Sequence, residues 1–232
     1  MGSFLARARR VRAVVVMAVC TLAAAVALPA APAQAAAHDP VLFVHGVWTD
    51  GPTTWTDMIA DFEREGWDPA SLQMMNYNTA QSLEDSAAEV VDEVAALRAR
   101  TGAAKVDIVA HSMGAPMVRW YLKFLGGTQY VDDFVSIAGG NHGGIGTEFC
   151  APVQPSCQDM LMYSPFLQAL NSGDETPGPT TYTALWSSCD EFLNPDSTAL
   201  LDGADNIWAG CLGHVTMVNW PQNFVRTENA VA

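Results

Sequence analysis

The chain has 232 residues, of which 50% are hydrophobic and 16% are charged. This length and apolar content suit one globular domain with a full hydrophobic core. The 25 acidic residues outnumber the 11 basic ones, which gives a formal net charge of −14. Such a charge argues against nucleic acid and against anionic membrane surfaces as partners.

The first 35 residues have a different character from the rest. Four arginines precede an uncharged apolar run over residues 13–31, and Ala33-Gln34-Ala35 offers a small-x-small cleavage site. These are the parts of a secretory signal peptide, so we expect cleavage after Ala35 or Ala37. A membrane anchor is the alternative, but Pro29, the alanine content and the cleavage site argue against it. The twin arginines at positions 9 and 10 leave the export route open.

Two units follow from this: a signal peptide over residues 1–35 and a single secreted, extracellular domain over residues 36–232. Loss of the four leader arginines leaves seven basic against 25 acidic residues, a net charge near −18. Four cysteines remain, and an even number in an exported chain indicates two disulfides. Three pairings are possible, and we favour the sequence-local one, Cys150 with Cys157 and Cys189 with Cys211. The first bridge should staple a surface loop. No histidine or cysteine spacing indicates a zinc site, so we expect no metal.

Apolar runs and helical stripes alternate along most of this domain. We expect strands over residues 40–44, 72–77, 106–109 and 134–138, because each is a short apolar run. The spacing of apolar residues predicts helices over residues 55–65, 82–101 and 113–125. Ser82 begins the second of these helices in capping-box style, and Gly102 ends it.

The last third is less regular. Ser164-Pro165 is typical of the start of a short helix, a loop follows over residues 172–181, and Pro221 opens a C-terminal helix. Strands are expected over residues 182–186 and 207–209. Strands that alternate with helices predict an α/β domain with a mostly parallel central sheet and helices on both faces.

The turn after the third long strand carries the most specific motif, Ala110-His111-Ser112-Met113-Gly114. A turn this sharp strains its central residue, so the positions two before and two after must be small. This is the pattern of the nucleophile elbow, with Ala110 where glycine is usual. The motif predicts that Ser112 is an exposed nucleophile at the start of a helix.

A serine nucleophile needs a base and a carboxylate that orients it. On α/β-hydrolase sheets these follow in the order Ser, Asp or Glu, His, each after a strand. His214 fits the base, and Asp190 fits the acid because it directly follows its strand. Asp202 and Asp205 are the alternatives for the acid. The remaining histidines are less suited to the base by position; they are His38, His45, His111 and His142.

Several segments together resemble the class 2 bacterial lipases, a family of small secreted enzymes with a compact α/β-hydrolase fold. The matching pieces are residues 41–46, 105–114, 187–190, 201–204 and 213–214. The resemblance implies a triad of Ser112, Asp190 and His214, and oxyanion N–H groups from Val47 and Met113. The chain departs from the family in a longer loop over residues 139–165 and in its four added cysteines.

The expected function is therefore that of a secreted serine carboxylic-ester hydrolase, a triacylglycerol lipase or esterase that forms an acyl-enzyme. A short-chain, phospholipid or polyester esterase is the alternative, and a non-catalytic binding protein is a further one. We expect a monomer that needs no cofactor, takes a lipid or small ester at an oil–water interface, and does not insert stably into a membrane. Candidates for an apolar acyl groove, or for ordinary core packing, are Trp48, Met113, Met160, Met162 and Phe166.

Overall fold

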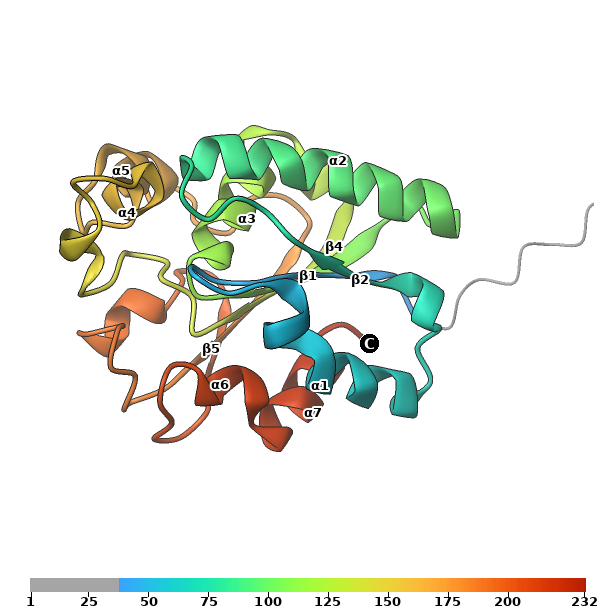
Figure 1. Cartoon of the computed structure of the whole chain (residues 1–232). Coiled ribbons are helices and arrows are strands. Elements are labelled where there is room, and N and C mark those ends of the chain that lie inside the picture. Colours follow the sequence, from blue (N-terminus) through green and yellow to red (C-terminus); the bar gives the residue numbers. More distant parts are fainter. Residues whose placement is uncertain (1–37) are drawn as a thin grey trace, which may run out of the picture. The chain divides into compact units, whose positions relative to one another are not determined.

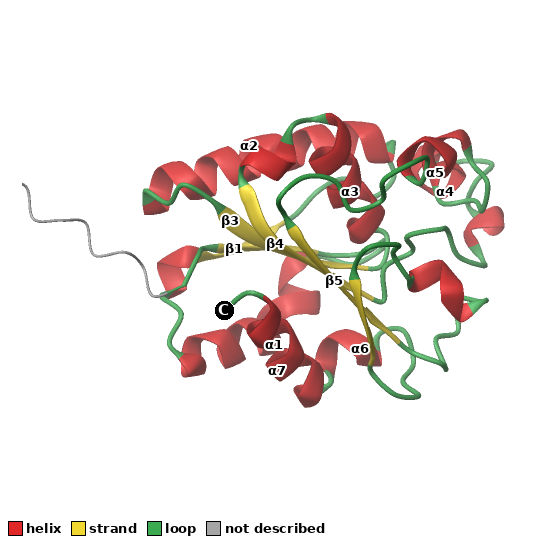
Figure 2. Ribbon diagram, turned by 180° about the vertical axis from the view of Figure 1, so that it is seen from behind, coloured by secondary structure: helices red, strands yellow, loops and turns green. Residues whose placement is uncertain are grey.

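The computed structural model describes residues 38–232, so the predicted signal peptide lies outside the described residues. A six-stranded sheet runs through the centre of this region (Figures 1 and 2). Its strands are β1 (Val41–Val44), β2 (Leu72–Met75), β3 (Val106–His111), β4 (Val131–Ile137), β5 (Thr181–Trp186) and β6 (Asp205–Trp208). Every neighbouring pair is parallel, and the order across the sheet is β2-β1-β3-β4-β5-β6. The predicted α/β architecture is confirmed.

Helices cover both faces of the sheet. On one side lie α2 (Leu83–Thr101) and α3 (Gly114–Phe124); on the other lie α1 (Gly51–Glu65), α6 (Thr216–Asn219) and α7 (Pro221–Ala230) (Figure 1). Two short helices, α4 (Pro155–Asp159) and α5 (Pro165–Leu170), lie together beyond one end of the strands. Among the described residues, no helix has the length and apolar character that crossing a membrane requires.

The alternation of side chains along each strand divides the core into two halves. Leu42 and Val44 of β1 pack with the helices α2 and α3, whereas Val41 and Phe43 pack against α1 and α7. All four side chains are fully buried. A strand with both faces covered reads as a continuous apolar run, which is why β1 shows no polar alternation in the sequence.

Local capping sets the helix ends. The Ser82 side chain accepts a hydrogen bond from the Asp85 N–H, and Gly102 closes α2 with a φ of 75°, as the sequence indicates. The first helix begins at Gly51, four residues before the predicted start, because Asp50 accepts a hydrogen bond from the Thr53 N–H at 2.8 Å. The helices α4 and α6 are too short for apolar spacing to predict them.

Parallel strands end at the same edge of the sheet, and this positions the loops that matter most. The loops after β1, β3, β5 and β6 carry, in turn, Val47, Ser112, Asp190 and His214. Residues separated by more than 160 positions in the chain therefore meet at one edge, where ligands of open α/β sheets bind.

Candidate active site

Ser112 lies at the sharp turn between β3 and α3, and its backbone has a φ of +55°. This is the left-handed region, which costs energy for a residue with a side chain and is typical of strained functional sites. Gly114 permits the turn, because a Cβ atom there would lie 2.6 Å from the carbonyl oxygen of His45. The strained elbow expected from the sequence is therefore present.

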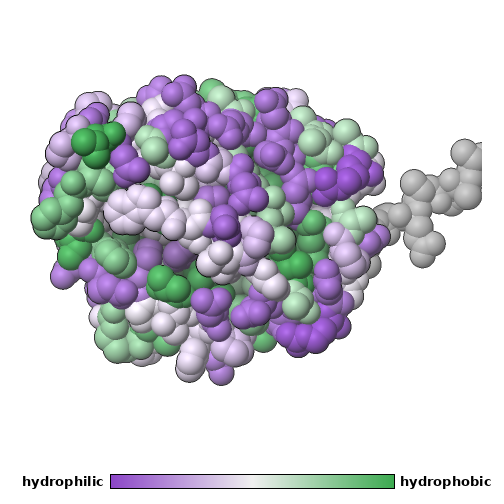
Figure 3. All heavy atoms as spheres, viewed as in Figure 1, coloured by the Kyte–Doolittle hydropathy of each residue, from purple (hydrophilic) through white to green (hydrophobic). Residues whose placement is uncertain are grey.

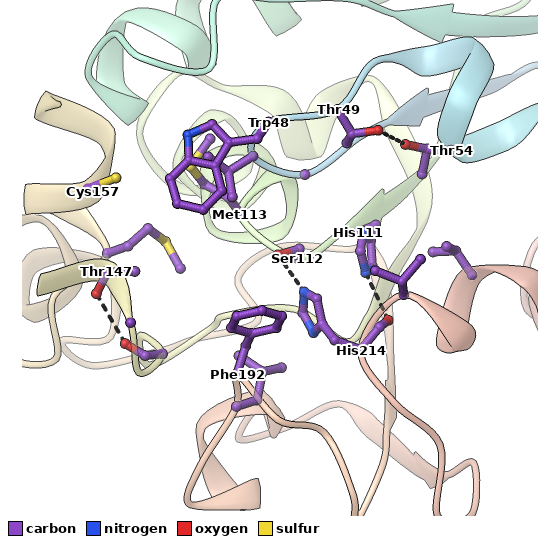
Figure 4. Close-up of a pocket in the computed structure, with 18 of the residues that line it drawn as sticks. Trp48, Thr49, Thr54, His111, Ser112, Met113, Thr147, Cys157, Phe192 and His214 are labelled. Carbon is purple, nitrogen blue, oxygen red and sulfur yellow. Dashed lines mark hydrogen bonds between the residues drawn. The ribbon is translucent and has the colours of Figure 1, made fainter. Parts of the chain in front are cut away.

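Two hydrogen bonds join the three residues predicted to form a triad (Figure 4 shows the first). Ser112 Oγ lies 2.8 Å from His214 Nε2, and His214 Nδ1 lies 2.7 Å from Asp190 Oδ2. A carboxylate can only accept, so the proton on the ring lies on Nδ1, and Nε2 is left to accept from the serine hydroxyl. Both His214 and Asp190 are buried, with side-chain exposures of 8% and 1%.

The second carboxylate oxygen of Asp190 is fixed as well. Asp190 Oδ1 accepts hydrogen bonds from the backbone N–H groups of Phe192 and Leu193, at 2.9 and 3.0 Å. The alternative acids lie elsewhere. The Asp202 N–H donates to Glu175, and Asp205 begins β6. Neither has a hydrogen bond to His214 in the structure.

The remaining histidines have other surroundings. His142 Nε2 bonds to Glu175 at 2.9 Å, which suits the loop-ordering role that its position suggests. His45 is buried and stacks on Tyr77 with 4.6 Å between ring centroids. Burial lowers the pKa of His45, and it lowers that of His111 well below the usual value. His111 Nε2 lies 3.3 Å from the carbonyl oxygen of His214, a contact that the sequence does not predict.

The two residues expected to supply oxyanion donors, Val47 and Met113, line the same pocket as Ser112. Met113 precedes the first residue of α3, at the positive end of that helix. Gly46 lets the loop after β1 approach the elbow, because a Cβ atom at this position would lie 2.8 Å from Ser112 Cβ. Val47 thus follows a residue whose backbone lies close to Ser112.

A pocket of about 380 Å³ opens above Ser112. Trp48 and Phe192 lie on opposite sides of the serine in Figure 4, and both are partly exposed. The pocket has predominantly apolar walls, formed by Val47, Trp48, Met113, Ile145, Met160, Phe192, Leu193, Val215 and Val218 among others. It therefore has the size and character of a site for an apolar small-molecule group.

The expected acyl-groove residues are only partly correct. Trp48, Met113 and Met160 line the pocket, but Met162 and Phe166 do not. Phe166 is 4% exposed and stacks on Trp120 at 4.6 Å, within the core, and Met162 is 40% exposed outside the pocket. Phe192 and Ile145 take part instead, from loops whose path could not be read from apolar spacing.

The structure contains both disulfides in the sequence-local pairing. Cys189–Cys211 joins the loop that carries Asp190 to the loop that carries His214. Cys150 and Cys157 belong to the pocket wall, and Cys157 is only 3% exposed. The first bridge therefore lies at the pocket, a position that the sequence does not predict.

Comparison with known proteins identifies the family. The profile of the family Lipase (class 2) matches residues 38–207, most of the chain. Among solved structures, the mature Bacillus licheniformis lipase BlEst2 aligns with a TM-score of 0.72 at 15% identity, over 84% of this chain and 93% of that one. Aspergillus fumigatus lipase B aligns with a TM-score of 0.71 at 19% identity, over 84% of this chain and 52% of that one.

A third solved structure, the lin2722 gene product from Listeria innocua, aligns with a TM-score of 0.62 at 12% identity, over 83% of this chain and 93% of that one. At such identities these likenesses describe the fold, which is that of the α/β-hydrolase lipases. The family match carries the assignment further, because it covers the elbow, the loop after β1 and Asp190. This chain belongs to the class 2 lipase family.

Proposed function

We propose that this class 2 lipase is a secreted triacylglycerol lipase or esterase that cleaves carboxylic esters through an acyl-enzyme. The observation that carries the proposal is the unbroken chain of hydrogen bonds from Ser112 through His214 to Asp190, on a strained elbow beneath an apolar pocket. Such a hydrogen-bond arrangement serves nucleophilic catalysis, and a protein that only binds has no use for it.

The chemistry follows from the geometry. His214 Nε2 takes the Ser112 proton while Oγ attacks the ester carbonyl, and Asp190 stabilises the imidazolium that forms. The N–H groups of Val47 and Met113 stabilise the tetrahedral oxyanion, each by about 3–4 kcal/mol if it acts as such donors do elsewhere. His214 then donates its proton to the departing alcohol, and the Ser112 ester remains. Water, activated by the same histidine, releases the acid.

The pocket supports an apolar acyl or alkyl group as the substrate portion next to Ser112. Trp48 and Phe192 leave a slot between them, and Met160 lies among the lining residues. A lipid ester at an oil–water interface fits this chemistry. Short-chain, phospholipid and polyester substrates share the ester group, so the preference of the enzyme for acyl length and for the alcohol portion decides between them.

Secretion is part of the proposal. Two disulfides are expected in an oxidising compartment outside the cytosol, and residues 1–35 have the sequence of a removable signal peptide. We propose a mature monomeric domain that begins near residue 36. Mass measurement of protein recovered from the growth medium would give the cleavage position directly.

The test begins with the nucleophile. Ser112→Ala removes the attacking oxygen, so kcat should fall by about 10⁴- to 10⁶-fold while the protein stays folded. A panel of acyl esters from acetyl to oleoyl, below and above their solubility, measures turnover and length preference. A fluorophosphonate probe should label the wild type and spare the variant. Activity above a tenth of the wild-type value in Ser112→Ala would contradict the serine mechanism.

A further inference from the structure

The main chain of His214 is held from both sides, by the sequence neighbours of its two triad partners. Glu191 follows Asp190, and its Oε2 accepts a hydrogen bond from the His214 N–H at 2.9 Å. His111 precedes Ser112, and its Nε2 lies 3.3 Å from the His214 carbonyl oxygen. Asp190 and Ser112 contact the imidazole ring of His214. In each of the two sequence pairs, 190–191 and 111–112, one residue therefore contacts the ring and the other contacts the backbone of His214.

The hydrogen-bond pattern fixes the state of His111. A carbonyl oxygen only accepts, so His111 Nε2 carries the proton and donates it. The ring is buried and its Nδ1 has no partner among the described residues, so the neutral form with a single N–H satisfies the only contact present. Burial keeps the pKa of His111 well below its usual value, which agrees with a neutral ring. The two histidine rings lie 4.7 Å apart, so a neutral His111 also adds no charge that would oppose the His214 imidazolium.

Glu191 acts from the other side of the same residue. Its carboxylate bonds to a backbone N–H, which makes a charge-assisted hydrogen bond, stronger than one between neutral groups. Gly213 leaves the space for it, because a Cβ atom at residue 213 would lie 3.3 Å from Glu191 Oε2. Glu191 itself is exposed, so its contact with the base is not a by-product of core packing.

We propose that Glu191 and His111 are positioning residues that fix the backbone of the base, so that His214 Nε2 stays within reach of Ser112. Asp190 alone sets the tautomer and direction of the ring, but a ring on a shifting backbone would still move away from the serine. Proton transfer is sensitive to such movement, because a displacement near 1 Å costs on the order of 10²-fold in rate. The inference rests on the proposed function, in which His214 is the base.

Two pairs of variants separate the hydrogen bonds from charge and volume. Glu191→Gln keeps an oxygen acceptor, whereas Glu191→Ala removes it. His111→Gln keeps an N–H donor near the position of Nε2, whereas His111→Phe keeps a ring without a donor. We expect kcat to fall about 10- to 100-fold in Glu191→Ala and His111→Phe, with KM within about twofold, and to recover substantially in both glutamine variants. Asp205→Asn, an exposed acid on the same stretch without a contact to His214, should match the wild type.

A second measurement does not depend on turnover. The proton between His214 Nδ1 and Asp190 should give a low-field proton resonance in the wild type. This resonance should broaden or move in Glu191→Ala and His111→Phe and persist in Glu191→Gln. Unchanged kcat and an unchanged resonance in Glu191→Ala, with only a lower melting temperature, would overturn the inference and leave a purely structural contact.

The two hypotheses fail in different ways. If the wild type hydrolyses no ester and reacts with no fluorophosphonate, the proposed function is wrong. The resonance still tests whether the contacts of Glu191 and His111 hold His214 in place. If the wild type is active and Glu191→Ala equals it in kcat, the function stands and the positioning role is wrong.

Combining Glu191→Ala with His111→Phe should give a change in log kcat that differs from the sum of the single changes, because both contacts restrain one residue.

Discussion

Asp190 accepts three hydrogen bonds, and their arrangement decides what a conservative replacement would do. Its Oδ1 is occupied by the N–H groups of Phe192 and Leu193, so an asparagine would place its own oxygen there. The amide nitrogen would then face His214 Nδ1, which would have to accept. The ring proton would move to Nε2, where it would oppose the hydroxyl of Ser112.

Asp190→Asn should therefore reduce kcat by about 10⁴-fold without unfolding the protein. Asp202→Asn and Asp205→Asn are the matched controls, because both acids follow Asp190 within 15 residues and neither bonds to His214. Steady-state kinetics on one soluble ester is sufficient. If Asp202→Asn were inactive and Asp190→Asn active, the acid of the triad would be Asp202 instead of Asp190.

A second carboxylate, Asp107 on β3, lies in the core at 1% exposure. Burial raises its pKa to about 8, and Asp133 adds to the effect. Its Oδ1 accepts from the Asp133 N–H at 3.0 Å, and its Oδ2 has no partner among the described residues. Near neutral pH the folded state therefore favours the protonated form, unlike the unfolded chain.

The sign of the resulting pH dependence follows by linkage. The folded-state pKa is above the unfolded value, so the stability that Asp107 contributes is fully present below about pH 4 and is lost as pH rises toward 8. Asp107→Asn cannot ionise and keeps an acceptor for the Asp133 N–H. Its melting temperature relative to the wild type should rise between pH 5 and pH 9. A constant difference across that range would contradict the raised pKa.

At the scale of elements, the two disulfides should have separable effects. Cys189–Cys211 connects the loop of Asp190 to the loop of His214. If these residues act as proposed, Cys189→Ser with Cys211→Ser should lower kcat while far-UV circular dichroism still reports a folded sheet. The loss in stability should be about 3 kcal/mol on the chain-entropy view. If activity is lost only together with the circular dichroism signal, the bridge is purely structural.

The bridge Cys150–Cys157 forms part of the pocket wall, so its removal should act on the choice of substrate. Cys150→Ser with Cys157→Ser should change the ratio of kcat/KM between long and short acyl esters by about 200-fold at most, since one altered contact in an apolar pocket is worth about 1–3 kcal/mol. The control is Cys189→Ser with Cys211→Ser, which should change the turnover of all esters alike. An unchanged ratio would show that this wall does not touch the acyl chain.

The elements also show where sequence reasoning works. The long helices and buried strands were predictable, because apolar spacing and caps such as Ser82 and Gly102 act within a few residues. The proximity of Ser112, Asp190 and His214 was predictable because parallel strands bring their carboxyl ends together. The contacts of Glu191 and His111 were not, because they join side chains to the main chain of a residue up to 103 positions away. Such a contact leaves no pattern in residue type.

For the whole molecule, charge should govern the choice of lipid surface. Residues 38–232 hold 25 acidic and seven basic side chains. Added anionic phospholipid should therefore slow hydrolysis of a neutral triacylglycerol emulsion at low salt. Salt near 1 M should remove most of the difference, because the screening length is then about 3 Å. Turnover of a soluble ester is the control and should not respond. Faster hydrolysis on the anionic surface would contradict the prediction. Figure 3 shows hydrophilic and hydrophobic residues interspersed on the face viewed, and the exposed apolar residues of the described chain include Phe149 and Val153.

The sheet order has a consequence for how the enzyme should fail on warming. Ser112 follows β3, which has partners on both sides, whereas His214 follows β6, a four-residue strand that lies at the edge of the sheet among residues 38–232 and pairs there with β5. Edge segments open locally at a lower free energy than the centre of a fold. Cys189–Cys211 would keep Asp190 and His214 together as that edge loosens, so the first contact to be lost should be the one between His214 and Ser112. Heat inactivation should then begin with a reversible separation of His214 from Ser112. Cooling should restore activity as long as the central strands have stayed folded.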